Sequence, residues 1–133
     1  MKYMLDTDIC IALIKRKPPN ILERFHSLTV GDIGISSITL AELKYGVARS
    51  QAVEKNARAL EEFLLPLEIA DFGEQAASCY GPVRAELEMA GMPIGPLDTQ
   101  IGAHALSLDI TLVTANTKEF CRITPLRIEN WLE

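Results

Sequence analysis

Short apolar runs alternate with helical patterns along the whole chain, and this alternation restricts the fold more than any other feature of the sequence. The apolar runs predict strands over residues 2–5, 33–35, 67–70, 111–113 and 126–128. Strands that are separated by helices are typical of a parallel sheet with crossover connections. We therefore predict an α/β fold in which helices flank a small central parallel sheet.

Two of the segments between these strands carry apolar residues at helical spacing, and we expect both stripes to lie in the core. The stripes are Val53, Ala57, Leu60 and Leu64, and then Ala76, Tyr80, Val83 and Leu87. The second helix should stop at Gly91. A third helix is predicted over residues 98–108, after the turn at residues 93–96.

The length and composition predict one domain over residues 1–133. The chain is 48% hydrophobic, and a chain of this size can bury roughly two-thirds of its unfolded surface around one core. No apolar run approaches the roughly 20 residues of a membrane span. Asp6 and Asp8 interrupt the first apolar run before a signal peptide could form. We expect a cytoplasmic protein without a membrane contact.

The cysteines and histidines offer no obvious site. Cys10, Cys79 and Cys121 are odd in number and lack CxxC spacing, so we expect buried free thiols and neither zinc nor disulfides. A metal-independent ribonuclease of the two-histidine kind needs paired imidazoles. His26 and His104 have no such context, and each is expected to be packed or hydrogen-bonded.

The net charge of −5 is unusual for a protein that binds nucleic acid, because affinity for phosphate comes mostly from Lys and Arg side chains. Two explanations remain at this point. Either the substrate is not a nucleic acid, or some of the acids form a site in which bound cations reverse the local charge.

Polar side chains recur where predicted strands give way to helices. Asp6 ends the first strand, Glu42 follows the second, Asp98 opens a helix and Asn116 follows the fourth strand. In a right-handed parallel fold these junctions meet at the carboxyl edge of the sheet, where ligands bind. We therefore expect these residues to converge.

Helix capping is the simpler interpretation of each residue taken singly. Asp and Asn are favoured caps, and Thr39-x-x-Glu42 and Asn116-x-x-Glu119 resemble capping boxes. Capping does not explain acids at three converging junctions, because neighbouring carboxylates repel one another. A hard divalent cation removes that repulsion, and Mg²⁺ accepts carboxylates, waters and phosphate oxygens. Such an ion supports phosphodiester hydrolysis.

Four strings, MLDTDIC, SSITLAELKYG, GMPIGPLD and LVTANTKEF, resemble the successive motifs of PIN-domain ribonucleases, in the order found in VapC toxins. The resemblance covers nearly the whole chain, and the GxPIGPxD string is its most specific part. It implies a parallel sheet wrapped by helices, a Mg²⁺ or Mn²⁺ site and endoribonuclease activity. It also implies inhibition by a VapB antitoxin, a homodimer, and contact with operator DNA only through the antitoxin complex.

The resemblance assigns catalytic and metal-binding roles to Asp6, Glu42 and Asp98. Asn116 stands where many PIN domains have Asp, so we predict that it holds a water or a neighbouring carboxylate. Glu119 then supplies the missing charge. Thr7 and Thr114 match adjoining family positions, where each hydroxyl either hydrogen-bonds one of these acids or stabilises a turn.

Two further positions have open interpretations. Asp8 stands where the family usually has Asn or Ser, and a place in the first helical turn explains it better than metal binding. Scattered cations are candidates for contact with an RNA backbone, although a solvated surface is the better explanation for each. They are Lys15, Arg16, Lys17, Arg49, Lys55, Arg58 and Arg84.

The motifs are most similar to those of enteric-type VapC toxins, which implies cleavage of initiator tRNA in its anticodon loop. Aromatic residues make up only 6% of the chain, so unspecific stacking on many bases is a poor means of binding, and a shaped loop is the better substrate.

Two other functions remain open. Leu5-Asp6-Thr7-Asp8 resembles the first motif of haloacid-dehalogenase-like phosphatases, but the later acids and the catalytic lysine of that family are missing. Asn116 at the fourth position also leaves a degenerate PIN module that binds metal without cleaving.

Overall fold

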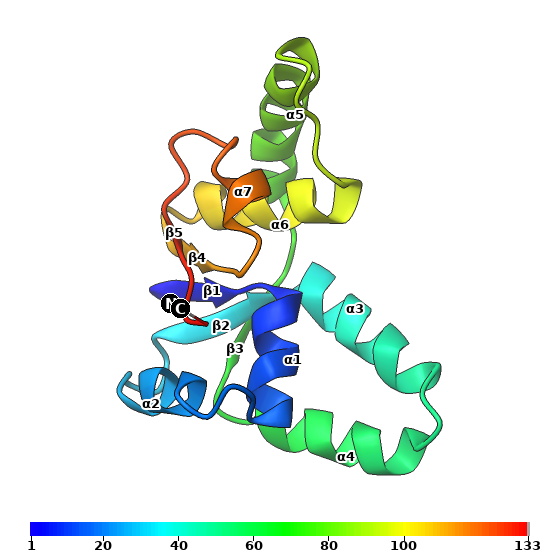
Figure 1. Ribbon diagram of the computed structural model, residues 1–133. Coiled ribbons are helices and arrows are strands. Elements are labelled where there is room, and N and C mark those ends of the chain that lie inside the picture. The colour runs from blue at the N-terminus through cyan, green and yellow to red at the C-terminus, as the bar shows by residue number, and fades with distance from the viewer. Residues whose placement is uncertain (133) are drawn as a thin grey trace.

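Five short strands form one parallel sheet at the centre of the computed structural model, which describes residues 1–132 (Figure 1). The spatial order is β3-β2-β1-β4-β5, and every neighbouring pair is parallel. The α/β prediction is therefore confirmed. The strands are β1 Tyr3–Leu5, β2 Ile33–Ser36, β3 Glu68–Ala70, β4 Thr111–Val113 and β5 Ile128–Glu129.

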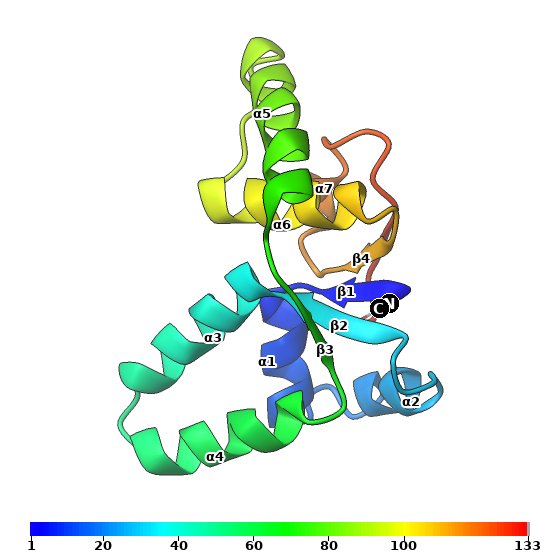
Figure 2. The same ribbon diagram turned by 180° about the vertical axis from the view of Figure 1, so that it is seen from behind.

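Helices cover both faces of this sheet. In both views, α1 to α4 lie on one face and α5 to α7 on the other (Figures 1 and 2). Within residues 1–132, no helix is long and apolar enough to cross a bilayer. The helices are α1 Thr7–Lys15, α2 Ile21–His26, α3 Ser37–Ala48, α4 Val53–Leu64, α5 Glu74–Met89, α6 Pro96–Ser107 and α7 Thr117–Phe120.

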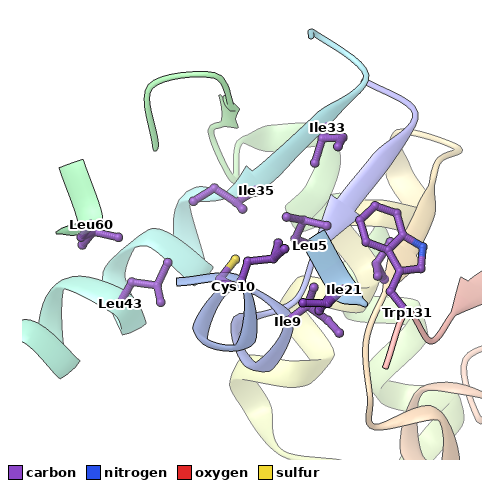
Figure 3. Packing of buried hydrophobic residues seen from close by; sticks show 11 residues of the cluster. Leu5, Ile9, Cys10, Ile21, Ile33, Ile35, Leu43, Leu60 and Trp131 are labelled. Carbon is purple, nitrogen blue, oxygen red and sulfur yellow. The ribbon is translucent and has the colours of Figure 1, made fainter. Parts of the chain in front are cut away.

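The central strands supply side chains to two separate cores, because successive residues of a strand point to opposite faces. Met4 and its partner Leu112 pack against α5 to α7, whereas Leu5 and its partner Val113 pack on the side of α1 to α4. Figure 3 shows the second of these cores, with Leu5 beside residues of α1, α2 and β2. The central strands β1, β2 and β4 are therefore buried on both faces, which explains their largely apolar sequences.

The chain leaves β1 toward β2 and β3 on one side and returns through α5 and α6 to β4 on the other side. Strand order therefore reverses between β1 and β4. In open α/β sheets, ligands bind beside the carboxyl ends of the strands at such a reversal. Asp6 follows β1 and Asn116 follows β4, so both lie at this point.

The predicted core stripes have different outcomes. Ala76, Val83 and Leu87 of α5 are buried, as expected. In α4, Leu60 is buried, but Val53 is 45% exposed and Ala57 is also exposed, so that part of the prediction is wrong. The reason is that α4 packs against α1 and α3 rather than against the sheet (Figure 2).

Other expectations also need correction. Among the thiols only Cys10 is buried, whereas Cys79 is half-buried, and Cys121, the residue that follows α7, is exposed. The last strand begins two residues later and ends one residue later than predicted, and the sequence pattern does not predict α2. His104 is buried and hydrogen-bonded as expected, but His26 is exposed.

Candidate active site

Asp6 directly follows β1 and is the N-cap residue of α1. Its Oδ1 accepts a hydrogen bond from the Thr7 backbone N–H at 2.8 Å, and its Oδ2 accepts one from the Thr114 hydroxyl at 2.8 Å. The side chain is only 5% exposed. The capping interpretation is therefore correct for Asp6, and the same carboxylate is also tied to the segment that follows β4.

Glu42 projects from α3, which the structure caps at Ser36. The Ser36 hydroxyl accepts from the Ile38 backbone N–H, and Thr39 is buried inside the helix, so the predicted capping box from Thr39 to Glu42 is wrong. The Thr7 hydroxyl instead donates to Glu42 Oε1 at 2.7 Å. This bond connects the start of α1 with the second turn of α3.

Asp98 is the third residue of α6, which begins at Pro96 rather than at Asp98. The N-cap is Gly95, so Asp98 does not cap the helix, but its place in the first turn still favours a negative charge. Farther along α6, His104 Nδ1 lies 2.8 Å from Ser36 Oγ, and this contact links α6 to the start of α3.

The segment between β4 and α7 completes the site. The Thr114 hydroxyl accepts from the Asn116 backbone N–H at 3.0 Å, and the Asn116 amide donates to Glu119 Oε2 at 3.1 Å. Asn116 and Glu119 are thus joined side chain to side chain, without the reciprocal backbone bonds of a capping box. Asp8 Oδ2 accepts from the Ala115 backbone N–H at 3.2 Å, which ties α1 to the same segment.

Five acids gather here, and we name them the acidic cluster: Asp6, Asp8, Glu42, Asp98 and Glu119. Burial, with the charge of Asp8 as the next cause, raises the pKa of Asp6 to about 7. Burial also raises the pKa of Asp98, followed by the charges of Glu119, Glu42 and Asp8. These influences show that residues distant in the sequence lie close enough to repel one another, as the predicted convergence requires.

Asp8 contributes more to the acidic cluster than its place in a first helical turn predicts. It does lie in the first turn of α1, but burial raises its pKa and it also acts on Asp6 and Asp98. Its Oδ1 is buried without a hydrogen-bond partner in the described part of the chain. The signal for it was the spacing of two acids on either side of Thr7, directly after a buried strand.

The donor chemistry of the acidic cluster fits a hard divalent ion. Carboxylate oxygens are the ligands that Mg²⁺ takes, and the unpartnered oxygen of Asp8 is an acceptor that the protein alone does not satisfy. Within residues 1–132, however, no three acidic, histidine or cysteine side chains are spaced to enclose an ion as they stand. The carboxylates would have to draw closer on binding.

The family model of the PIN domain matches residues 3–124. The chain belongs to the PIN-domain family. Over 131 residues it is 48% identical to the tRNA(fMet)-specific endonuclease VapC of Salmonella typhimurium and 46% identical to the protein of that name from Shigella flexneri, with 98% of each chain covered in both comparisons.

Solved structures agree with this assignment. The chain matches a crystal structure of DNA-bound VapBC from Salmonella typhimurium with a TM-score of 0.93 and 48% identity, over 98% of both chains. It matches VapBC2 from Rickettsia felis, bound to a promoter DNA fragment, with a TM-score of 0.92 and 44% identity, over 98% and 99% of the two chains. This PIN domain is therefore a VapC-type ribonuclease, and neither alternative function is favoured.

Proposed function

We propose that this chain is the toxin of a VapB–VapC pair, and that it hydrolyses initiator tRNA in the anticodon loop with Mg²⁺ or Mn²⁺. The observation that carries the proposal is the acidic cluster at the strand reversal. Within residues 1–132 none of its five acids forms an ion pair with Lys or Arg, whereas ion pairs do form elsewhere on the surface. A cation from outside the chain would relieve the repulsion within a set of unpaired, partly buried acids.

In the proposed mechanism Asp6, Glu42 and Asp98 hold the ion. When bound, a divalent ion polarises the phosphodiester and lowers the pKa of water. Thr7 and Thr114 keep the carboxylates of Glu42 and Asp6 oriented by neutral hydrogen bonds, which leave their negative charge intact.

The remaining polar residues position the acids. Asn116 holds Glu119 so that its charge faces the same site. Water is the nucleophile in this scheme, so the ribose 2′-hydroxyl takes no part. The products should carry a 5′-phosphate and a 3′-hydroxyl.

The tRNA substrate is proposed from the relatives and from composition. The Salmonella and Shigella relatives are named as tRNA(fMet)-specific endonucleases. A chain with a net charge of −5 and 6% aromatic residues has little capacity for unspecific RNA binding. A folded RNA loop that fits the site is therefore the favoured substrate. We expect the protein to act in the cytoplasm.

Labelled initiator tRNA tests the substrate and the metal in one assay. It is incubated with Mg²⁺, Mn²⁺ or EDTA beside an unstructured RNA of equal length, and the product ends are mapped. We expect one cut in the anticodon loop, only with a divalent ion. Equal cutting of both RNAs would remove the tRNA proposal, and 2′,3′-cyclic phosphate ends would remove the mechanism.

A groove between α1, α3 and α4 of this chain is a candidate binding site for the antitoxin. This groove has a volume of about 390 Å³ and is lined largely by apolar residues, with Glu42 at its wall. We propose that the C-terminal segment of a VapB-type antitoxin lies in it and extends an Arg or Lys into the acidic cluster. Its apolar lining includes Ile11, Ile14, Leu43, Gly46, Val47 and Leu60.

Gly46 offers a test of the groove. A Cβ added at Gly46 meets nothing within 4 Å, so the backbone there accepts a side chain, and Gly46→Leu would extend into the groove that Gly46 lines. The variant should cleave RNA as the parent does and escape inhibition by the antitoxin. If the antitoxin inhibits both proteins equally, the groove is not its binding site.

The proposal also includes a homodimer. It further includes contact with operator DNA, made only through the antitoxin complex. Exposed apolar side chains at the end of α5 and the start of α6 are available for a contact between copies. Met89 is 88% exposed, Met92 48% and Leu97 47%. Light scattering should give a dimer for the parent and a shift toward monomer for Met89→Glu. A monomeric parent at all concentrations would contradict this part.

A further inference from the structure

The outer face of α3 carries a row of three side chains that begins in the acidic cluster. Glu42, Tyr45 and Arg49 are spaced i, i+3 and i+7, so they lie on one face of the helix. Glu42 is fixed at one end by its bond from Thr7. We name Glu42, Tyr45 and Arg49 the α3 row.

Tyr45 is unusual in this chain because it is large, aromatic and 67% exposed. It is the only strongly exposed Phe, Tyr or Trp side chain among residues 1–132; the others contribute to packing. Its ring is covered on one side by the Arg49 guanidinium, whose central carbon lies 5.6 Å from the ring centroid. An aromatic ring that the core does not use is available as a stacking platform.

The charge near this ring also favours a polyanionic ligand. Lys44 and Arg49 are both exposed, and within residues 1–132 neither forms an ion pair. In a chain with a net charge of −5, Arg49 is an unneutralised cation over an exposed ring, and Lys44 is a second one at the preceding position of the helix. A single-stranded RNA segment offers both a base for the ring and phosphates for the cations.

The helix geometry places this platform close to the acids. Three residues of an α-helix rise about 4.5 Å and seven residues about 10 Å, which spans one to two nucleotides of an extended strand. A strand whose scissile phosphate meets Glu42 would therefore pass over Tyr45 and then Arg49. A second copy of the chain matches this face less well, because it would have to supply acidic partners for Lys44 and Arg49.

We propose that Tyr45 stacks on an RNA base next to the scissile phosphate and that Arg49 contacts a phosphate of the same strand. This inference rests on the proposed ribonuclease function and assigns to α3 a role in substrate recognition in addition to carrying Glu42. Tyr45 acts through affinity for RNA and has no part in bond cleavage.

The test compares Tyr45→Ala, Tyr45→Phe and the parent on the initiator tRNA anticodon stem–loop. Loss of one stacked base should raise KM about tenfold and leave kcat within about twofold, and Phe should restore the parental KM because it keeps the ring. A loop base replaced by fluorescent 2-aminopurine should be quenched by the parent and by Tyr45→Phe but not by Tyr45→Ala. Leu65→Ala is the matched control, because Leu65 is 79% exposed at the end of α4.

Arg49→Gln tests the phosphate contact by salt dependence. Loss of one contact to a single strand should reduce the slope of log affinity against log salt by about 0.7. Lys2→Gln removes an exposed positive charge before β1, at the opposite edge of the sheet, and should leave the slope unchanged. An equal change of the slope in both variants would show that Arg49 contributes only to the overall charge of the protein, and it would overturn the assigned phosphate contact.

The outcomes separate this inference from the proposed function. If the parent cleaves the stem–loop and Tyr45→Ala has the parental KM and parental quenching, the stacking role is wrong while the nuclease assignment stands. If the parent cleaves no RNA, the proposed function itself fails. If Tyr45→Ala changes KM only together with the oligomeric state in light scattering, Tyr45 belongs to an interface between copies and the stacking role is again overturned.

Discussion

Acids at the amino edge of the sheet are paired with cations, whereas the acidic cluster at the carboxyl edge is not. At the amino edge acids are paired with cations: Asp32 with Lys2, Glu68 with the N-terminal amine of Met1, and Asp109 with Arg127. At the carboxyl edge the acidic cluster has only neutral hydrogen-bond donors, and burial adds to mutual repulsion.

The comparison shows where function conflicts with stability. Exposed ion pairs contribute little to folding, so the amino edge is close to neutral in free energy. Unpaired acids held together lower the free energy of unfolding of the metal-free protein. A ligand that binds the acids would explain an arrangement that destabilises the empty fold.

The largest effect is expected on catalysis. Asp6→Ala and Asp98→Ala should each lower RNA cleavage by about a thousandfold or more, because each removes a proposed ligand of the ion. Asp32→Ala, which removes an acid from the amino edge, should cleave at the parental rate. Circular dichroism verifies that all three proteins fold. Substantial cleavage by Asp98→Ala would exclude Asp98 from the site.

The second effect is a pH dependence of stability in EDTA. Asp6 has an ordinary pKa of 3.8 and a pKa of about 7 in the fold, so between these values the folded state binds more protons than the unfolded state. The free energy of unfolding should therefore fall as pH rises from about 4 to about 7, by up to about 4 kcal/mol from this group.

Urea titrations of the metal-free protein at pH 5 and pH 8 measure this dependence. Asp6→Asn removes the titrating group, so its stability should change less between the two pH values than that of the parent. Asp32→Asn, at the amino edge, should retain the parental dependence. If parent and Asp6→Asn respond identically, the raised pKa of Asp6 is wrong.

The third effect concerns the neutral donors. Thr7→Val keeps the shape of the side chain but removes the hydroxyl that holds Glu42, and it should lower cleavage by about tenfold through misplacement of that acid. Thr7→Ser retains the hydroxyl and should remain close to the parent. Equal rates for Thr7→Val and the parent would show that Glu42 needs no such support.

The smallest effect is a change in melting temperature. Asp98→Asn removes one charge from the acidic cluster, and relief of about 1 kcal/mol should raise the melting temperature in EDTA by roughly 3–6 °C. Excess Mg²⁺ should reverse the order, because the parent gains stability by binding the ion. Asp32→Asn removes the acid of the amino-edge pair with Lys2 and should not melt higher. An Asp98→Asn protein that melts lower than the parent in EDTA would remove the repulsion argument.

Much of the fold could be predicted from local pattern. Buried parallel strands are continuously apolar, so β4 was located at residues 111–113 and the other strands nearly so. Helix α2 was missed because it has six residues, of which only Ile21 is buried. Exposure of Val53 could not be predicted either, because a stripe at helical spacing does not reveal how far a helix stands from the sheet.

The site was predicted from topology more than from single residues. Parallel strands bring their carboxyl ends together, so the convergence of Asp6, Glu42 and Asp98 followed from the order of the elements. The bond from Thr7 to Glu42 spans 35 positions and depends on how α1 packs against α3. The unpartnered oxygen of Asp8 likewise depends on three-dimensional burial, which the spacing of two aspartates does not contain.

Glu42 belongs both to the acidic cluster and to the wall of the groove between α1, α3 and α4. If the proposed antitoxin segment fills the groove and the proposed RNA engages Glu42, the two compete for one side chain. Under that competition, abundant substrate would weaken the binding of the inhibitor by mass action, and abundant inhibitor would protect the substrate. The shared position of Glu42 would then make the ratio of the two partners, rather than the amount of either one, the quantity that sets the threshold of activity.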